Sequence, residues 1–580
     1  MVNFRRGNVM KLKKVFRLGL CGIFVFSSLN VGLAEPLSER SKTTVDVNVS
    51  AAILDIVEDD EISAYGKSSR DVPYEVEGGN IYFYKSTGLI TYCESGVTSA
   101  VIPSEIEGYK VTGIAADAFS GCSDLASVTI PEGVISIGQN AFNKCDSLTT
   151  ITIPDSVTDI NRGAFVKCKA LTSINVGENN AAYTSVDGVL YNKNITVLVC
   201  CPGGKSGEFA IPTTVNNVFS YGFDGCNQLT AITIPNSVTN IEGNAFNGCK
   251  KMTAINVEES NAAYISIDGV LYDKALTTLV CCPAGKIGSV TVPDSVTVIS
   301  DHGFDGCWKV TAVALPANLT TIGEYGFYGC SKLTDIAIPN SVRSIGKYAF
   351  NRCRKLTAIT IPEGVTAIGE YTFGECTYLA DINLPDSVTA IGKYAFYNCL
   401  SVHAIRLPKN LKVIEDNTFT VCSLMSAVEI PEGVTTIGRS AFGACRNLTS
   451  ITIPDSVTNI DSDAFMGCNC LTITCNAGSY ALDYAIENNI PYIKIYPQGK
   501  VFIYGDASDN GSLEADDAAI VLCKVLDYDY KPQLQRDTED WFELLNVDCD
   551  GSLTSADAAT ILHKVLDGSF VMECEKNSAV

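Results

Sequence analysis

A short pattern of apolar and polar residues recurs between about residue 100 and residue 475. One copy, residues 148–168, reads Leu-Thr-Thr-Ile-Thr-Ile-Pro-Asp-Ser-Val-Thr-Asp-Ile-Asn-Arg-Gly-Ala-Phe-Val-Lys-Cys. Each copy carries a Phe and, three positions later, a Cys, and neighbouring copies lie 23 residues apart except for two steps of 58. A fixed period in the twenties predicts a solenoid whose units pack on their neighbours. The pairs are Phe119/Cys122, Phe142/Cys145, Phe165/Cys168, Phe223/Cys226, Phe246/Cys249, Phe304/Cys307, Phe327/Cys330, Phe350/Cys353, Phe373/Cys376, Phe396/Cys399, Phe419/Cys422, Phe442/Cys445 and Phe465/Cys468.

Within each copy the apolar spacing predicts three pieces of structure. Leu-x-x-Ile-x-Ile-Pro alternates apolar and polar residues, which is typical of a short strand that the Pro ends. Val-Thr-x-Ile-Gly predicts a second extended piece. Ala-Phe-x-x-Cys predicts one helical turn, because its three apolar residues would share a buried side. The outward positions of the first strand are mainly Thr, Ser, Ala, Asn and Asp, which suits either a broad protein contact or a plain solvated face.

Two inserts near 177–208 and 258–289 lie inside the 58-residue steps and carry a second motif. Residues 181–191 and 262–272 share the sequence Ala-Ala-Tyr-x-Ser-x-Asp-Gly-Val-Leu-Tyr, and each is followed by an apolar run and Cys-Cys-Pro. Asp-Gly between apolar runs predicts a β-hairpin. We interpret both inserts as structural elaborations of the solenoid, the alternative being a binding face.

The remaining stretches predict the domain boundaries. Residues 1–34 have the basic start, apolar run and small residues of an export signal, 35–75 read as a flexible leader, and 76–118 as an N-terminal cap. The solenoid spans 119–475. In the C-terminal cap, 476–496, Ser479 caps a helix whose buried face is Ala481, Leu482, Ala485 and Ile486. A linker (497–500), a separate module (501–570) and a tail (571–580) follow.

Composition narrows the classes of partner. A formal net charge of -23 argues against a nucleic-acid or anionic-membrane partner. The chain has 24 cysteines, and an exported chain would use them for disulfides, but thirteen occupy one repeat position, where equivalent sites cannot all pair. A metal array is the alternative, yet the ladder offers no second ligand type. We therefore expect buried thiols.

The repeat Leu-Thr-x-Ile-x-Ile-Pro-x-Ser-Val-Thr-x-Ile-Gly-x-x-Ala-Phe-x-x-Cys resembles the BspA-like class of bacterial leucine-rich repeats. The resemblance implies a fold of the α/β class, a β-rich leucine-rich-repeat solenoid on a secreted or surface protein that binds other proteins. It brings no catalytic residues.

The module at 501–570 contains two related acidic loops, each leading into an apolar run of helical spacing. Calcium takes six or more oxygens from alternate positions of a loop that turns on a Gly and closes with a carboxylate at its twelfth position. The loops therefore predict two Ca²⁺ ions. The ligands expected are Asp506, Ser508, Asn510, Asp517 and the Ser512 carbonyl in the first loop, and Asn546, Asp548, Asp550, Asp557 and the Ser552 carbonyl in the second.

This duplicated loop–helix unit resembles a type I-like dockerin, the small all-α module by which cellulosomal proteins dock on scaffoldin cohesins. Ser508 and Asn546 depart from the usual ligands, so both calcium sites would be weaker. The resemblance implies cohesin contacts in each copy. These map to Ala515, Asp516, Leu522 and Cys523 in the first copy and to Ser555, Ala556, Leu562 and His563 in the second.

The sequence offers little catalytic chemistry. Only His302, His403 and His563 are present, at unrelated positions, and the acidic residues after Ile-Pro recur as turn residues. We therefore expect a secreted, extracellular, non-catalytic binding component of a polysaccharide-degrading complex, held by a scaffoldin cohesin and carrying a protein ligand on its solenoid. The alternatives are a cell-surface adhesin and an enzyme with its active site in the solenoid inserts.

Overall fold

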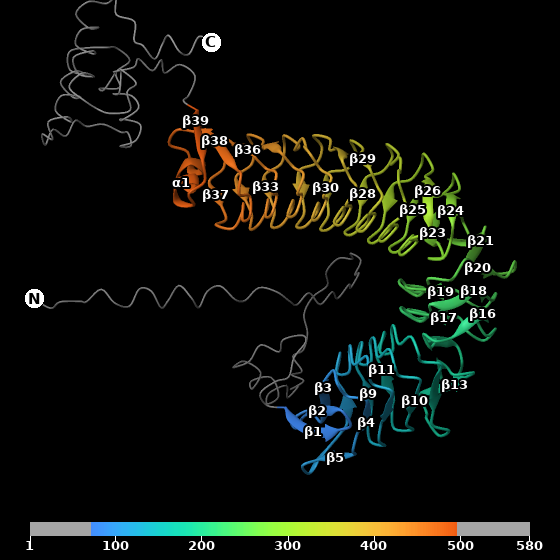
Figure 1. Cartoon of the computed structure of the whole chain (residues 1–580). Helices are drawn as coiled ribbons and strands as arrows, with labels where there is room; N and C mark the ends of the chain where they lie inside the picture. The colour runs from blue at the N-terminus through green and yellow to red at the C-terminus, as the bar shows by residue number, and fades with distance from the viewer. Residues whose placement is uncertain (1–70, 496–580) are drawn as a thin grey trace, which may run out of the picture. The chain divides into compact units, whose positions relative to one another are not determined.

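The computed structural model describes residues 71–495, which form a stack of short coils (Figure 1). Each coil has a first strand and a second strand, and both pair in parallel with their counterparts in the next coil. Ile151 of one first strand, for example, lies opposite Ile174 of the next, and Ile137 of one second strand lies opposite Ile160. This arrangement places the alternate apolar residues of every coil between its two ladders. The predicted β-rich solenoid is confirmed.

The elements fall into five groups along the stack. The N-terminal cap holds β1 (Val72–Val76), β2 (Gly79–Tyr84), β3 (Leu89–Cys93), β5 (Glu105–Ile106) and β6 (Tyr109–Lys110). The first strands are β4 (Ser99–Val101), β8 (Ser127–Thr129), β10 (Thr150–Ile153), β12 (Ser173–Val176), β16 (Ser206–Ala210), β18 (Gln228–Ile234), β20 (Ala254–Val257), β24 (Gly288–Thr291), β26 (Val310–Ala314), β29 (Ala358–Thr360), β31 (Asp381–Asn383), β34 (Ala427–Glu429), β36 (Ser450–Ile453) and β38 (Thr472–Asn476). The second strands are β7 (Gly113–Ile114), β9 (Ser136–Ile137), β11 (Asp159–Ile160), β17 (Asn217–Val218), β19 (Asn240–Ile241), β25 (Val298–Ile299), β27 (Thr321–Ile322), β28 (Ser344–Ile345), β30 (Ala367–Ile368), β32 (Ala390–Ile391), β33 (Val413–Ile414), β35 (Thr436–Ile437) and β37 (Asn459–Ile460). The inserts add β13 (Tyr183–Val186), β14 (Val189–Asn192) and β15 (Val197–Cys200), then β21 (Tyr264–Ile267), β22 (Val270–Asp273) and β23 (Thr278–Cys281), and the C-terminal cap holds α1 (Tyr480–Glu487) and β39 (Tyr492–Ile495).

The core of the stack is a column of phenylalanine rings. From Phe304 to Phe465 each ring stacks on the next, with centroids 4.8–5.6 Å apart and planes within 3–14°. Phe119, Phe142 and Phe165 form a shorter stacked run, and Phe223 and Phe246 form another. Each Phe buries roughly 150–250 Å² of surface, so this column supplies much of the apolar burial. It is divided at the two inserts.

The cysteines form a second buried column beside the rings. The Cys145 thiol donates to the carbonyl of Phe119 in the preceding coil at 3.2 Å, and Cys376 donates to Phe350 at 3.1 Å. The cysteines of the described residues are free, and burial raises the pKa of ladder thiols such as Cys353. The expectation of buried thiols is confirmed for the ladder, in which Cys468 alone is partly exposed, and each ladder thiol also makes a hydrogen bond that packing alone would not require.

The predicted helical turn at Ala-Phe-x-x-Cys is wrong. Phe142 accepts a single i+3 bond from the Cys145 N–H at 3.2 Å, but the segment is a turn rather than a helix. Asn140, two residues before the ring, and Lys144, two after it, have φ values of 55° and 58°. Left-handed residues on both sides prevent helical hydrogen bonding from continuing. The same positions are left-handed in many other coils, so the turn is a fixed part of the repeat.

Both ends of the described stack are capped, with two differences from expectation. β1 pairs with β2, so ordered structure begins at Val72, inside the predicted leader. At the other end Ser479 caps α1 as expected, accepting a bond from the Leu482 N–H. Ile486, however, is exposed, and Tyr484 is buried instead, with its ring edge-on to Phe465 at 6.0 Å. The larger ring covers the open end of the Phe column, which an Ile would not.

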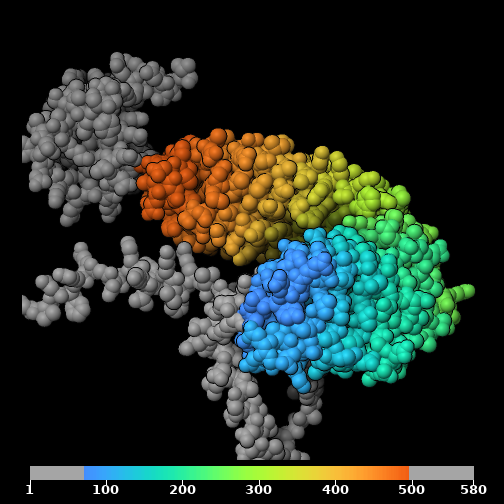
Figure 2. Space-filling model, turned by 60° about the horizontal axis from the view of Figure 1, so that its bottom comes forward, coloured from blue at the N-terminus to red at the C-terminus, as the bar shows by residue number. Residues whose placement is uncertain are grey.

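Figure 2 shows, on one face of the molecule, the side chains of successive coils packed side by side from residue 71 to residue 495. No helix within these residues has the length and apolar character needed to cross a bilayer. The linker, the module at 501–570 and the export signal lie outside the described residues.

Candidate functional site

The two inserts form the predicted hairpins and replace part of a coil. β21 pairs antiparallel with β22 around Asp268-Gly269, and both turn residues have positive φ. β23 then takes the place of a second strand and pairs in parallel with β25. The Cys282 N–H donates to the Gly303 carbonyl at 2.7 Å, the bond that a Phe N–H makes in ordinary coils such as Phe304 to Gly326. Cys282 therefore stands where a core Phe would, and the left-handed turn before that Phe is missing.

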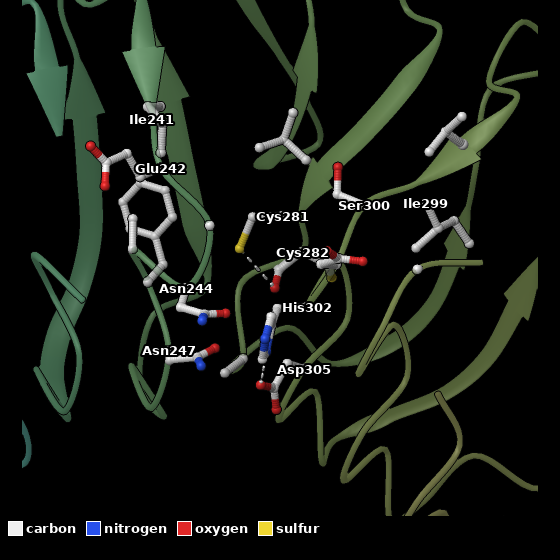
Figure 3. A pocket seen from close by; sticks show the side chains of 18 of the residues that line it. Ile241, Glu242, Asn244, Asn247, Cys281, Cys282, Ile299, Ser300, His302 and Asp305 are labelled. Atoms are coloured by element: carbon white, nitrogen blue, oxygen red, sulfur yellow. Dashed lines mark hydrogen bonds and ion pairs between the residues drawn. The ribbon is translucent and has the colours of Figure 1, made fainter. Parts of the chain in front are cut away.

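A cavity of about 410 Å³ occupies the place of the missing turn at the second insert (Figure 3). Four neighbouring parts of the chain line it: the coil of Phe246, the insert, the coil of Phe304 and the second strand of the coil of Phe327. Its polar side chains come from Glu242, Asn244, Asn247, Ser300, Asp301, His302, Asp305 and Thr321. This volume lies within the range of small-molecule sites, which is about 300–1,000 Å³. We take it as the candidate site.

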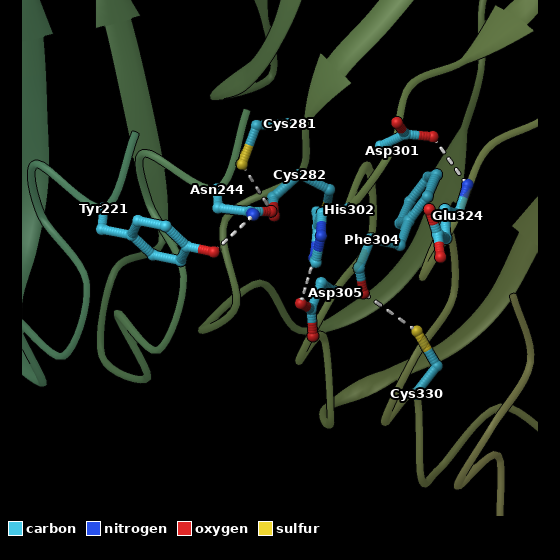
Figure 4. Close-up of polar contacts among 10 residues, drawn as sticks. All are labelled: Tyr221, Asn244, Cys281, Cys282, Asp301, His302, Phe304, Asp305, Glu324 and Cys330. Atoms are coloured by element: carbon cyan, nitrogen blue, oxygen red, sulfur yellow. Dashed lines mark hydrogen bonds and ion pairs between the residues drawn. The ribbon is translucent and has the colours of Figure 1, made fainter. Parts of the chain in front are cut away.

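His302 forms the end wall of this cavity. Its Nδ1 lies 2.6 Å from Asp305 Oδ2, and both side chains are mostly buried (Figure 4). One face of its ring stacks on Tyr325, with centroids 4.7 Å apart. Figure 3 shows the amides of Asn244 and Asn247 on the other side of the ring. The imidazole is therefore fixed in position by Asp305 and Tyr325 and presents its second face to the cavity.

His302 is also the first ring of an aromatic ladder that sequence reasoning missed. Tyr325, Tyr348, Tyr371 and Tyr394 continue it, with centroids 4.5–4.9 Å apart and planes within 3–11°. All five residues have positive φ, between 52° and 61°, which is uncommon for aromatic residues. The sequence does contain a pattern that indicates this ladder, because a Tyr stands two residues before the Phe in four consecutive copies. Since the rings cover each other's faces, the ladder offers solvent mainly its edges and hydroxyls.

The cavity also contains the thiol of Cys281. A reactive thiol here would favour the alternative of an enzyme with its active site in the inserts. The Cys281 Sγ lies 3.6 Å from the Cys282 carbonyl, to which it donates. Burial raises the pKa of this thiol, which keeps it protonated and weakly nucleophilic. The arrangement of a fixed imidazole, a carboxylate and two amides is suited to binding a ligand.

The first insert has the same cavity in a closed form, only about 10 Å³ in volume. Positions there and at the second insert correspond at an offset of 81 residues, so Phe219 corresponds to Ser300 and Arg162 to Gly243. The Arg162 guanidinium lies over the Phe219 ring at 4.8 Å and pairs with Glu242 at 2.9 Å. Glu242 corresponds to Gly323 at the second insert. We call Arg162, Phe219 and Glu242 the plug. Their counterparts at the second insert are Gly243, Ser300 and Gly323, although Glu242 itself also lines the second cavity from the neighbouring coil.

Comparison with known proteins identifies the repeat. A family model described as the BspA type leucine rich repeat region matches residues 90–203, 200–280, 281–366 and 345–472. The chain belongs to the BspA-type leucine-rich repeat family. A search of curated proteins gave no match.

Solved structures similar to this BspA-type chain include three bacterial proteins. A leucine-rich repeat protein from Eubacterium ventriosum is 24% identical, with a TM-score of 0.42, and the match covers 70% of this chain and 94% of that one. A leucine rich cell surface protein from Faecalibacterium prausnitzii is 24% identical (TM-score 0.35; 72% and 98% covered). A leucine-rich repeat protein from Bacteroides ovatus is 22% identical (TM-score 0.32; 74% and 99% covered).

As a BspA-type leucine-rich repeat protein, the chain has a fold without catalytic residues of its own, and the solenoid offers a surface suited to protein interaction. Its first strands present the expected small polar face, on which Thr150 and Thr152, for example, are exposed. The calcium and cohesin residues predicted at 506–563 all lie outside the described residues. The cavity lies at one of the two inserts, which the sequence suggested only as an alternative binding face or active site, and none of its residues was predicted.

Proposed function

We propose that the protein is a secreted, non-catalytic binding component of a polysaccharide-degrading, cellulosome-type complex. It docks through a calcium-dependent dockerin at residues 501–570 on a scaffoldin cohesin. The solenoid then holds a protein-interaction surface away from the scaffold. The observation that carries this proposal is the pair of acidic loops at 506–517 and 546–557, each followed by an apolar run of helical spacing.

The chemistry of the loops supports calcium in particular. Each loop places Asp, Asn or Ser at its first, third and fifth positions, Gly at its sixth and Asp at its twelfth. Hard oxygen ligands at alternate positions match the coordination that Ca²⁺ prefers, and the Gly permits the sharp turn. One such loop is common as a simple acidic turn, but a repeated loop with the same following run indicates a paired site.

Calcium titration of the intact chain tests this proposal. We expect two Ca²⁺ ions per chain by isothermal titration calorimetry. Replacing Asp506 by Asn removes a charged ligand from the first loop and should weaken that site about tenfold or more, leaving the second site unchanged. Asp548→Asn should do the same to the second loop.

Asp509→Asn is the matched control, since it removes the same charge from a loop position that does not ligate the ion. It should change calcium affinity by less than about threefold, the effect of a nearby unligated charge in water. A chain that binds no calcium, or in which the Asp509 and Asp506 variants lose equal affinity, would contradict the proposal.

A further inference from the structure

The cavity at the second insert differs from its counterpart at the first insert in one consistent way. The first is filled by side chains of the chain itself, with a guanidinium over a ring and paired with a carboxylate. The second has Gly243, Ser300 and Gly323 at the plug positions, and its volume is about 410 Å³ rather than about 10 Å³. The second cavity therefore lacks counterparts of the Arg162 and Phe219 side chains that fill the first.

The residues that line the open cavity could hold a ligand in the place of these side chains. His302 presents a flat ring face opposite the Asn244 and Asn247 amides. Asp305 is fixed beside that ring at 2.6 Å. The residues lining the cavity in these described coils include three carboxylates and neither a lysine nor an arginine, and one of the carboxylates, Glu242, is paired with Arg162 from outside the cavity. A flat group is favoured by the ring, and a positive charge is favoured by the carboxylates.

We propose that this cavity binds a planar organic cation, an amidinium or guanidinium group carried on a flat body. The flat body lies between the His302 ring and the two amides, and the cation pairs with Asp305. The ligand thus takes the place that Arg162 and Phe219 fill at the first insert. This site is independent of the calcium loops, because none of its residues belongs to 501–570.

Benzamidine is a suitable probe, and benzoate and benzyl alcohol are its anionic and neutral counterparts of similar shape. We expect saturable binding of one benzamidine per intact chain by isothermal titration calorimetry, with benzoate and benzyl alcohol at least about tenfold weaker, since a charge pair in a partly buried site contributes over 1.4 kcal/mol. Saturation-transfer NMR on the intact chain reports the same comparison for weak ligands.

The residues of the first insert suggest a variant that should block the second cavity. Gly243→Arg with Ser300→Phe restores two of the three plug residues, and a Cβ added to Gly243 would meet no atom within 4 Å. We expect this double variant to lose benzamidine binding while its circular dichroism and melting temperature stay unchanged. Asp305→Asn is the second variant, which keeps the shape and removes the charge, and it should weaken benzamidine at least about tenfold without affecting benzyl alcohol.

Three results would overturn the proposal. These are no saturable benzamidine binding to the unaltered chain, benzoate binding as tightly as benzamidine, and equal benzamidine binding by the plugged, Asp305→Asn and unaltered chains.

Discussion

Replacing Asn261 by leucine is expected to lower the free energy of unfolding by about 4 kcal/mol or more. Asn261 is 1% exposed and lies at the entry to the second insert. Its Nδ2 donates to the carbonyls of Pro235 and Val238 at 2.7 and 3.0 Å. Its Oδ1 accepts from the N–H groups of Ala263 and Tyr264, both at 2.8 Å. One side chain therefore satisfies four backbone groups.

Leucine has a similar shape but offers none of these bonds, so two buried carbonyls and two partly buried N–H groups would lose their partner. Each unsatisfied buried group costs about 1–3 kcal/mol, which gives the expected size. The measurement is chemical denaturation followed by circular dichroism, with hydrogen exchange to locate the coils that open. Asn180 makes the same four bonds at the first insert and should respond equally.

The neighbouring Asn179 is the control, because it is exposed and its side chain bonds only to Asp155. Asn179→Leu should cost less than about 1 kcal/mol. If Asn261→Leu proved no more destabilising than Asn179→Leu, the inserts would not depend on this buried amide.

Replacing Asp224 by asparagine is expected to stabilise the protein at pH 8 by about 2–3 kcal/mol and to have little effect at pH 4. Burial raises the pKa of Asp224 from 3.8 to about 6, and nearby Lys167 opposes this shift. Asp224 is 4% exposed, and its Oδ1 has no hydrogen-bond partner among the described residues. The native state must therefore hold an unfavourable buried charge at neutral pH.

The direction of the pH dependence follows from this raised pKa. Below pH 3.8 the carboxyl is protonated in both the folded and the unfolded chain, so folding carries no ionisation cost. Between pH 3.8 and 6 the folded chain binds more protons than the unfolded chain, so the free energy of unfolding falls as pH rises. The full cost of the buried charge is present above pH 6. A shift of one pKa unit corresponds to about 1.4 kcal/mol. Asparagine resembles the protonated acid and avoids this cost.

Urea denaturation of both chains at pH 4, 6 and 8 measures the effect. Asp159→Asn is the control, since Asp159 is exposed on β11 and should show no comparable trend. A difference between wild type and Asp224→Asn that stays constant from pH 4 to pH 8 would contradict the raised pKa.

Much of the fold was predictable because it depends on residues that repeat. The Phe and Cys columns follow from apolar residues at fixed offsets, and the Asp268-Gly269 hairpin follows from a turn pair that tolerates positive φ. The helical turn was wrong, because Asn140 and Lys144 adopt left-handed conformations that residue type alone does not require. Tyr484 is buried in place of the predicted Ile486, because the larger side chain covers the end of the Phe column.

The candidate site was not predictable in the same way. Gly243 and Ser300 look like ordinary loop residues in the sequence. The cavity exists because these small residues leave open the space that Arg162 and Phe219 fill at the first insert. Only alignment of the two inserts shows that an Arg and a Phe occupy these positions elsewhere in the chain. The Tyr ladder was visible as a 23-residue repeat, but its stacking depends on the left-handed backbone that brings Tyr325 and Tyr348 face to face.

Binding of the intact chain to immobilised cohesin, with calcium and then with a chelator, tests the central proposal most directly. We predict saturable binding in calcium that is lost on chelation, restored by added calcium, and weakened by the combined Asp506→Asn and Asp548→Asn changes. Binding that persists in the chelator, or no binding to any of a panel of cohesins in calcium, would contradict the proposal.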